Sequence, residues 1–242
     1  MRGLVFAGRN FKEMLRDPMT LAFGMGLPVV LLVIMSLIAR SAPVELFSIE
    51  LLAPAMGVFS FSFITLFTAL LMSKDRSGAF LVRLFATKMS AADFLLGYGL
   101  PVLPLGLLQG VVCYLAAVIM GLELSWGILL SFAVLLVAAV LYAACGMLLG
   151  AAFSDRQVGG FFSLFVNLST WLSGTWFDPK LVGGGFMKVA EILPFYHCVE
   201  ASRSALTLDF GGVLSHIWVV ALWALAALIA AVLIFGRKMK NN

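Results

Sequence analysis

Few residues in this chain have the type and spacing that catalysis or ligand chemistry requires. The two histidines, His197 and His216, are not spaced as a metal-binding pair, and no H-E-x-x-H pattern occurs. The run G-x-x-x-x-G-K-[ST], whose backbone holds nucleotide phosphates, is also absent. Three cysteines are an odd number, and Cys113 and Cys145 lie in long apolar stretches, which argues against a disulfide framework. We therefore expect no catalytic, cofactor-binding or metal-binding residue in this chain.

A different pattern combines arginine with an aromatic ring in the segment 74–92. Arg76, Phe80, Arg83 and Thr87 recur at helical spacing, so one helix face would carry an aromatic ring flanked by two guanidinium groups. Such a face suits docking onto another protein. The alternative is a helix on the membrane surface whose arginines are simply solvated.

The elements that must position these residues are long and apolar. Hydrophobic residues make up 62% of the 242 residues and charged residues 12%, about half the charged fraction of a soluble domain. A bilayer core of about 30 Å needs about 20 apolar residues per helix. Six uncharged runs reach or approach that length, the fifth being short: 20–39, 51–73, 94–121, 127–153, 158–172 and 214–235. The sequence therefore predicts an all-α integral membrane protein, a single transmembrane domain over 1–242 with six transmembrane helices. Pro101 and Pro104 predict a kink or tilt in the third.

The distribution of charge predicts an orientation for these six spans. If both termini are cytoplasmic, twelve of the 16 lysines and arginines lie inside and four outside. Basic residues gather in short loops on the cytoplasmic side of membrane proteins, so both termini are expected there. Anionic lipid headgroups account for these basic clusters, and a nucleic-acid partner is not needed to explain them.

Residues 1–18 predict an amphipathic helix that lies in the membrane interface. Pro18 then turns the chain into the first span. The alternative is an ordinary basic flank, which would not explain the apolar face. Apolar side chains share one face, with Val5 and Phe6 as exceptions: Leu4, Ala7, Phe11, Met14 and Leu15. Charged side chains take the other face: Arg2, Arg9, Lys12, Glu13, Arg16 and Asp17.

The segment 173–213 precedes the last span and is too apolar to be a free loop. Pro179, the glycines 183–185 and Pro194 break it into short pieces. Irregular backbone at membrane depth is tolerated only where protein or a water-filled cavity surrounds it. We therefore expect an external re-entrant segment that covers a cavity.

Taken as a whole, the chain resembles the permease subunits of type-2 ABC transporters, a family that includes bacterial exporters of drugs, polysaccharides and lipids. The resemblance covers nearly the whole chain, and two local patterns carry it, neither as specific as a Walker motif. Two departures from the family pattern occur. The acidic residue that usually comes just before the glycine of the cytoplasmic pattern, here Gly78, is present only as Asp75 beside Arg76, and Met89 stands where proline is common. The cytoplasmic pattern is Ser77-Gly78 followed by Arg83-Leu84, and the external one is Leu172-Ser173-Gly174, Phe177 with Pro179, Leu193-Pro194, and Ala201 with Arg203.

The resemblance implies how the chain would couple to an ATPase. The segment 74–92 would contain a coupling helix that fits into a groove on a separate ABC ATPase, which would bind ATP and Mg²⁺. The residues implied in that contact are Arg76, Gly78, Phe80, Arg83 and Leu84. Two ATPase copies and a second permease copy, forming a homodimer, are the simplest assembly.

The resemblance also implies a transport path, because the second and fifth spans line it in that family. Here those spans contribute Phe59, Phe63, Asn167, Thr170 and Trp171. Asn167 is the most informative of them, since a lone amide in hydrocarbon is costly unless it meets a polar partner or a cavity. The spans hold almost no ionisable residue, which argues against an ion-coupled transporter.

The implied function is therefore ATP-driven export of an amphipathic or hydrophobic substrate by alternating access. The implied location is the bacterial or archaeal cytoplasmic (inner) membrane. Two other classes stay open from the residues alone: a secondary transporter or channel that needs no ATPase, and a structural or assembly protein of the membrane.

Overall fold

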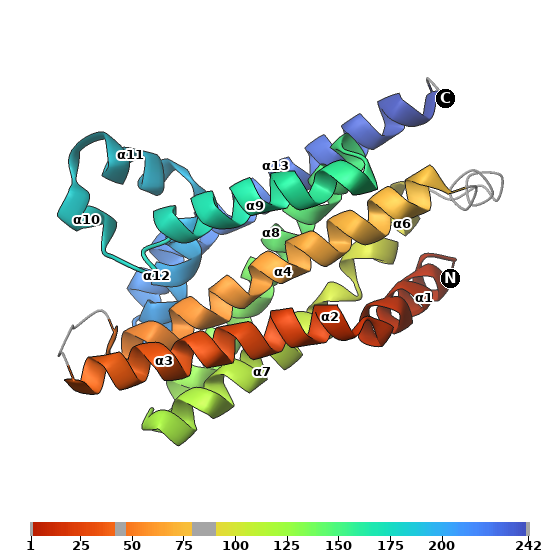
Figure 1. Cartoon of the computed structure of the whole chain (residues 1–242). Coiled ribbons are helices and arrows are strands. Elements are labelled where there is room, and N and C mark those ends of the chain that lie inside the picture. Colours follow the sequence, from red (N-terminus) through yellow and green to blue (C-terminus); the bar gives the residue numbers. More distant parts are fainter. Residues whose placement is uncertain (1, 42–46, 79–90, 241–242) are drawn as a thin grey trace.

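The computed structural model describes residues 2–41, 47–78 and 91–240, and within these ranges it contains helices and turns but no strand (Figure 1). One element, η1, is a single turn of π-helix that continues directly into the first long helix. The elements are α1 (Arg2–Arg16), α2 (Pro18–Leu21), η1 (Ala22–Gly26), α3 (Leu27–Ser41), α4 (Ile49–Ser77), α6 (Ala91–Gly99), α7 (Val102–Met120), α8 (Trp126–Ala152), α9 (Asp155–Leu172), α10 (Pro179–Val182), α11 (Gly184–Ile192), α12 (Pro194–Leu206) and α13 (Phe210–Lys240).

Length and hydropathy identify membrane-spanning stretches among these helices. In the described part of the chain, five stretches are long and apolar enough to cross a membrane: Ala22–Ser41, Ile49–Ser77, Leu96–Met120, Trp126–Ala152 and Phe210–Arg237. The expected all-α integral membrane class is confirmed. Helix α9, which contains the expected fifth span, is not among the five. Its 18 residues include charged residues at its start and polar residues along its length.

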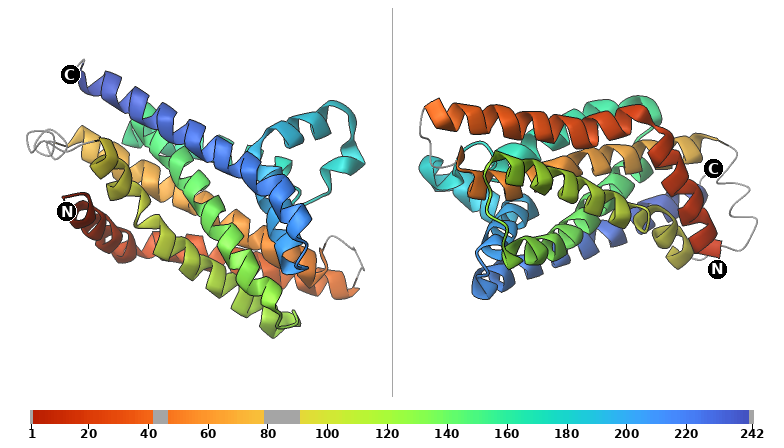
Figure 2. Two further views of the ribbon diagram at one scale, coloured as in Figure 1. Left: turned by 180° about the vertical axis from the view of Figure 1, so that it is seen from behind. Right: turned by 90° about the horizontal axis from the view of Figure 1, so that it is seen from below.

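The path of the chain bears on the number of crossings. Both termini lie at the same end of the bundle, while α10 and α11 lie at the other (Figures 1 and 2). Helix α9 runs along the bundle beside α4 (Figure 1). A chain that begins and ends at the same end of a bundle crosses it an even number of times. Five spans alone would be an odd number, so we count α9 as a sixth span. That count remains a prediction.

Helix α4 is the centre of the bundle. In its most apolar window 83% of the residues are buried, against 22% for the stretches at 22–41 and 210–237. It packs against α3, α7, α8, α9 and α12. A helix buried to this extent has little lipid-facing surface, so most contacts of α4 are with the other helices.

Small residues allow α8 to approach α4 closely. A Cβ added at Gly146 would lie 2.7 Å from the Thr65 carbonyl oxygen, and one added at Gly150 would lie 2.8 Å from that of Ala69. The G-x-x-x-G pattern of α8 therefore serves packing within one chain, in the way that small residues let membrane helices approach.

The third span is broken where the sequence predicts a kink. Helix α6 ends at Gly99 and α7 begins at Val102, with Leu100 and Pro101 in a turn between them. Pro101 has no amide hydrogen to continue the helix ladder, which explains the break at this position. Helix α7 then ends at Met120 and is capped by Gly121, whose φ of 119° is a left-handed conformation that glycine adopts without strain.

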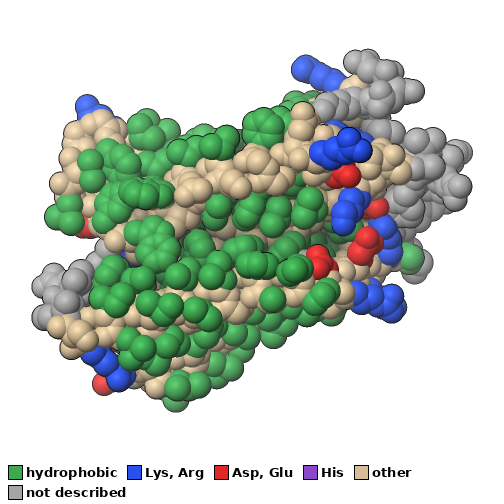
Figure 3. Space-filling view, in the orientation of Figure 1, with side chains coloured by type: hydrophobic (Ala, Val, Ile, Leu, Met, Phe, Trp, Pro, Cys, Tyr) green, Lys and Arg blue, Asp and Glu red, His purple; other side chains and the backbone are tan. Residues whose placement is uncertain are grey.

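The surface is divided by polarity as a membrane requires. Apolar side chains cover the middle of the molecule, and charged side chains gather towards its two ends, most densely at the end that holds the termini (Figure 3). Charges at the ends lie at the depth of lipid headgroups and water.

Candidate coupling site and transport path

Helix α1 is joined to the end of α4 by a buried carboxylate. Asp75, 5% exposed, accepts two hydrogen bonds from Arg9: Nη1 lies 2.8 Å from Oδ2, and Nη2 lies 3.0 Å from Oδ1. The hydroxyl of Tyr98 on α6 donates to the same Oδ2 over 2.8 Å. Burial lowers the pKa of Arg9, but the hydrogen bond and the charge of Asp75 outweigh it and raise that pKa above its ordinary value. Three helices therefore meet at one charge, close to the point where α4 ends and residues 79–90 follow.

A second set of contacts fixes α1 against α6. The Asn10 side-chain amide donates to the Gly97 carbonyl oxygen over 2.9 Å, and the Gly3 amide donates to Asp93 Oδ1 over 3.0 Å. Phe6 packs edge-on against Tyr98, with ring centroids 5.0 Å apart. At Gly97 any side chain would overlap Phe6, so the two helices need glycine at this contact.

These contacts correct the expected apolar face of residues 1–18. Phe6, treated as an exception, is buried together with Ala7 and Met14 of the expected stripe, whereas Leu4 and Leu15 of that stripe are 58% and 37% exposed. The buried face of α1 is therefore rotated towards Phe6, and the other edge of the stripe, with Leu4 and Leu15, forms an outward surface. The outward surface suits the lipid interface. Four side chains expected at the interface are exposed or half-buried: Arg9, Phe11, Lys12 and Arg16.

Arg76 connects α4 to the junction between α8 and α9. Its guanidinium donates to the carbonyl oxygen of Ala151 and, over 2.6 Å, to that of Phe153. These carbonyls lie where α8 ends, at Ala152, and have no partner in a continuing helix. A residue that the sequence places on a docking face thus serves as a C-terminal cap for another span.

The expected coupling segment 74–92 is only partly described. Its first residues belong to α4, which continues to Ser77, and Gly78 follows as an exposed cap whose amide donates to the Lys74 carbonyl oxygen over 3.0 Å. Its last two residues begin α6. Phe80, Arg83 and Leu84 lie outside the described residues.

Phe63 is the centre of an aromatic cluster in the expected path. Its ring contacts four others from α4, η1 and α9, at centroid distances of 6.0 to 6.4 Å: Phe23, Phe59, Phe67 and Phe162. Phe59 also contacts Trp176, which follows α9, at 6.1 Å. The cluster lines the side of α4 that faces α9 and the first span.

The three residues of α9 that are expected to line the path lie on different sides of that helix. Thr170 is 6% exposed, whereas Trp171 is 56% exposed and Asn167 is exposed. The Asn167 amide donates to the Ser163 carbonyl oxygen over 2.7 Å, within its own helix. The polar partner of the Asn167 amide therefore lies one turn earlier in α9 and not on another helix. Asn167 and Trp171 share an outward face with Ser163, apart from the aromatic cluster around Phe63.

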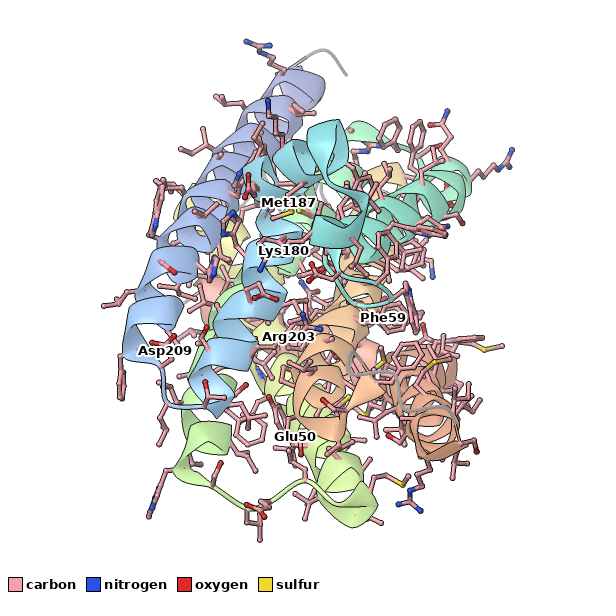
Figure 4. The ribbon with its side chains drawn as sticks, turned by 90° about the vertical axis from the view of Figure 1, so that its left-hand side faces the viewer. Glu50, Phe59, Lys180, Met187, Arg203 and Asp209 are labelled. Carbon is pink, nitrogen blue, oxygen red and sulfur yellow. The ribbon has the colours of Figure 1, made fainter. Side chains whose placement is uncertain are left out.

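Arg203 holds the segment between α9 and α13 against the bundle. Its guanidinium pairs with Glu200 at 2.8 Å and donates to the carbonyl oxygens of Leu51, at 3.2 Å, and Gly174, at 3.1 Å. Figure 4 shows Arg203 between α12 and α4. Because Leu51 lies in the first turn of α4 and Gly174 follows α9, this side chain ties α12 to both expected path helices.

The two histidines, which sequence spacing does not relate, are hydrogen-bonded to each other. Their Nδ1 atoms lie 2.8 Å apart, and His197 Nε2 lies 2.7 Å from the Glu191 carbonyl oxygen. Since a carbonyl can only accept, Nε2 of His197 carries the proton, and its Nδ1 accepts from His216. The Trp223 indole donates to the Ile192 carbonyl oxygen over 2.9 Å. These bonds join α11, α12 and α13. In the described part of the chain, no group of three His, Cys, Asp or Glu side chains could hold a metal ion.

The sequence as a whole was compared with known families. The profile of the ABC-2 type transporter family matches residues 4–207, which is most of the chain and extends from α1 through α12. The chain belongs to the ABC-2 type transporter family. This match supports the permease-subunit assignment, and an ABC ATPase is the partner that membership implies in general. A search of curated proteins found no match.

Membership in the ABC-2 family gives the contacts above a context. The ABC-2 membrane domain is a transport permease and not a catalytic domain. The contacts of Arg9, Asp75 and Arg76 lie near the end of α4, after which residues 79–90 follow in the sequence.

Proposed function

We propose that this ABC-2 permease is an exporter driven by a separate ABC ATPase, and that it moves an amphipathic or hydrophobic substrate out of the cytoplasm. Two permease copies and two ATPase copies form the working unit, with ATP and Mg²⁺ bound by the ATPases. The proposed location is the bacterial or archaeal inner membrane, with both termini in the cytoplasm. The charge asymmetry of the sequence supports this orientation.

The observation that carries the proposal is the convergence of three connections at the end of α4. Asp75 ties α4 to α1 and α6, and the neighbouring Arg76 ties it to the end of α8. A displacement of residues 79–90 by an ATPase would therefore reach four helices at once. Since α4 is the most buried span, the same displacement would be transmitted along the centre of the bundle.

The proposed path lies beside α4 and is completed by the second permease copy. Helices α3 and α9 flank α4 in Figure 1, and each presents exposed side chains outward. On α9 these combine small, polar and apolar types, a mixture that suits close helix contact and an amphipathic substrate better than lipid alone. The exposed residues of that face are Gly160, Ser163, Leu164, Asn167, Leu168 and Trp171.

Co-purification tests the proposal at its base. The tagged full chain, extracted from its native membrane, is expected to bring down an ABC ATPase in a one-to-one ratio. The reconstituted complex should then move an amphipathic fluorescent substrate in one direction only when ATP is present. Purification of the chain without any ATPase, or transport that persists without ATP, would refute the proposal.

Substitution of the coupling segment makes the test specific. Phe80→Ala combined with Arg83→Ala should weaken ATPase association and abolish substrate-stimulated ATP hydrolysis, while membrane insertion stays intact. A matched control is Asp155→Asn with Arg156→Gln, which changes two exposed charged residues at the start of α9. If both double variants behave alike, Phe80 and Arg83 do not form a docking surface for the ATPase.

A further inference from the structure

A cavity of about 290 Å³ lies between the end of α1 and the last turns of α4. Its lining comes from two distant parts of the chain. Residues from the end of α1 and the following turn are Glu13, Met14, Arg16 and Asp17, and residues from α4 are Phe67, Leu70, Leu71 and Lys74.

The cavity has an apolar side and a charged rim. Phe67, Leu70 and Leu71 of α4 form the apolar side. Lys74 lies seven residues further along α4 than Phe67, which at 1.5 Å per residue is about 10 Å. That distance is comparable to the depth over which a bilayer changes from acyl chain to headgroup. An occupant must therefore be apolar at one end and charged at the other.

The partners of the four charged groups decide the sign of the occupant. Glu13 forms an ion pair with Arg9 at 2.8 Å, and Asp17 caps α2 by accepting from the Met19 amide over 3.1 Å. No ion pair is found for the Arg16 guanidinium or the Lys74 ammonium among the residues that the structure describes. Both acidic groups are thus already engaged, and two cations are left at the rim of the cavity.

We propose that this cavity binds one phospholipid molecule by its phosphate. The phosphate diester lies between Arg16 and Lys74, and the first acyl carbons lie against Phe67, Leu70 and Leu71. Arginine can bind two phosphate oxygens in parallel, and lysine acts as a point charge beside them. An anionic headgroup is favoured over a zwitterionic one because Arg16 and Lys74 are rim cations without an ion pair among the described residues, and Lys12 lines an adjoining cavity on the other side of α1.

Such a lipid would bridge the same two elements as the Arg9 to Asp75 ion pair. It would hold the carboxyl end of α1 to α4, while the ion pair holds the middle of α1. The lipid is therefore a structural ligand of α1. This inference depends on neither the direction of transport nor an ATPase.

The test measures lipid retained by the purified full chain in detergent. Native mass spectrometry with added phosphatidylglycerol should show one lipid bound more tightly than any others, and the thermal midpoint should rise with lipid concentration. Arg16→Gln with Lys74→Gln should weaken that binding about tenfold, since each basic residue beside an anionic headgroup contributes to the attraction. Loss of no more than twofold would overturn the proposal.

Two controls distinguish this site from general surface attraction and from a site for soluble phosphate. Arg156→Gln with Arg237→Gln removes two exposed cations from the same end of the bundle, and it should leave tight binding unchanged. If this control weakens lipid binding as much as Arg16→Gln with Lys74→Gln does, the lipid is held by general attraction to a basic surface. Inorganic phosphate should neither compete with phosphatidylglycerol nor raise the thermal midpoint, and if it does both, the site binds soluble phosphate.

The charge-preserving pair Arg16→Lys with Lys74→Arg keeps the proposal testable if the neutral variant fails to fold. It should retain one tightly bound phosphatidylglycerol, and loss of that lipid would count against the proposal. Leu70→Ser, on the apolar side of the cavity, should weaken binding of phosphatidylglycerol. Inorganic phosphate should still leave the thermal midpoint of this variant unchanged. Full retention of lipid in Leu70→Ser would show that the acyl chains do not lie in this cavity.

Discussion

Arg9 and Asp75, 66 positions apart in the chain, form a two-point ion pair at 2.8 and 3.0 Å. Asp75 is 5% exposed and Arg9 is partly exposed, and the pair joins α1 to the end of α4, the most buried span. Parallel hydrogen bonds of this kind fix orientation as well as distance. A movement of α4 at this point must therefore move α1 or break the pair.

Arg9→Ala should destabilise the protein by about 2 kcal/mol. It leaves a buried carboxylate without its counter-charge, a change that costs about 3 to 5 kcal/mol when both partners are buried and less here because Arg9 is partly exposed. Thermal unfolding in detergent measures the loss. Asp75→Asn in the Arg9→Ala background should recover part of it. Glu13→Gln, which removes only the exposed partner of Arg9, is the control and should change little. Equal losses for Arg9→Ala and Glu13→Gln would contradict the structural role of the pair.

Gly146→Ala should destabilise the α4 to α8 contact by about 1 to 3 kcal/mol, the usual range for overpacking. Its Cβ would lie 2.7 Å from a backbone oxygen, which cannot rotate away as a side chain can. Gly159→Ala in α9 is the matched control, because nothing lies within 4 Å of the added carbon. It should be neutral or stabilising by up to about 1 kcal/mol, since alanine favours helix over glycine. The comparison uses the thermal midpoints of both variants, and equal behaviour would contradict the close packing.

Gln109→Met should stabilise the protein. The Gln109 side chain is fully buried in α7, and neither of its amide atoms has a hydrogen-bond partner among the described residues. A buried polar group left in this state costs about 1 to 3 kcal/mol, and methionine has a similar shape without the polar atoms. The thermal midpoint should rise. A fall instead would show that an ordered water or a second conformation satisfies the amide.

Asn167→Leu should leave protein level and basal ATP hydrolysis near the wild-type values and shift the preference among substrates. Interhelical hydrogen bonds in membranes average about 0.6 kcal/mol, and the Asn167 amide bonds only within its own helix, so folding has little to lose. Transport across a panel of amphipathic substrates measures the shift, with Ser163→Ala on the same face as a second probe. An unchanged profile would remove Asn167 from the path, and lost expression would assign it to helix packing.

Cysteine labelling tests the proposed orientation. Lys180→Cys should react with an impermeant thiol reagent added outside intact cells, and Ser77→Cys should react only after the membrane is opened. Both positions are exposed, so access to the reagent depends on the side of the membrane. The native Cys113 and Cys198 are buried, and Cys145 is half-buried within α8, so the unsubstituted chain is labelled in parallel to measure the background. Labelling in the reverse order would invert the topology.

The sequence by itself determined the class of this protein and the order of its helices. Uncharged runs of membrane length can fold only as helices in lipid, because every backbone polar group must be satisfied within its own segment. The break near Pro101 follows from the same local chemistry, since proline removes a backbone donor wherever it stands. These properties depend on residues close together in the chain, and a pattern of neighbouring residues is sufficient to predict them.

The tertiary structure alone decided which side chains meet. It placed Phe6 in a buried contact beside Ala7 and Met14, because where α6 lies decides how much of the hydrophobic stripe of α1 is buried and which neighbouring residues are buried with it. It paired His197 with His216, and it made Arg76 a cap for α8 in addition to its place in the expected coupling segment 74–92. A polar side chain is satisfied by whichever partner the packing of spans brings within about 3 Å, and no spacing along the chain encodes that distance.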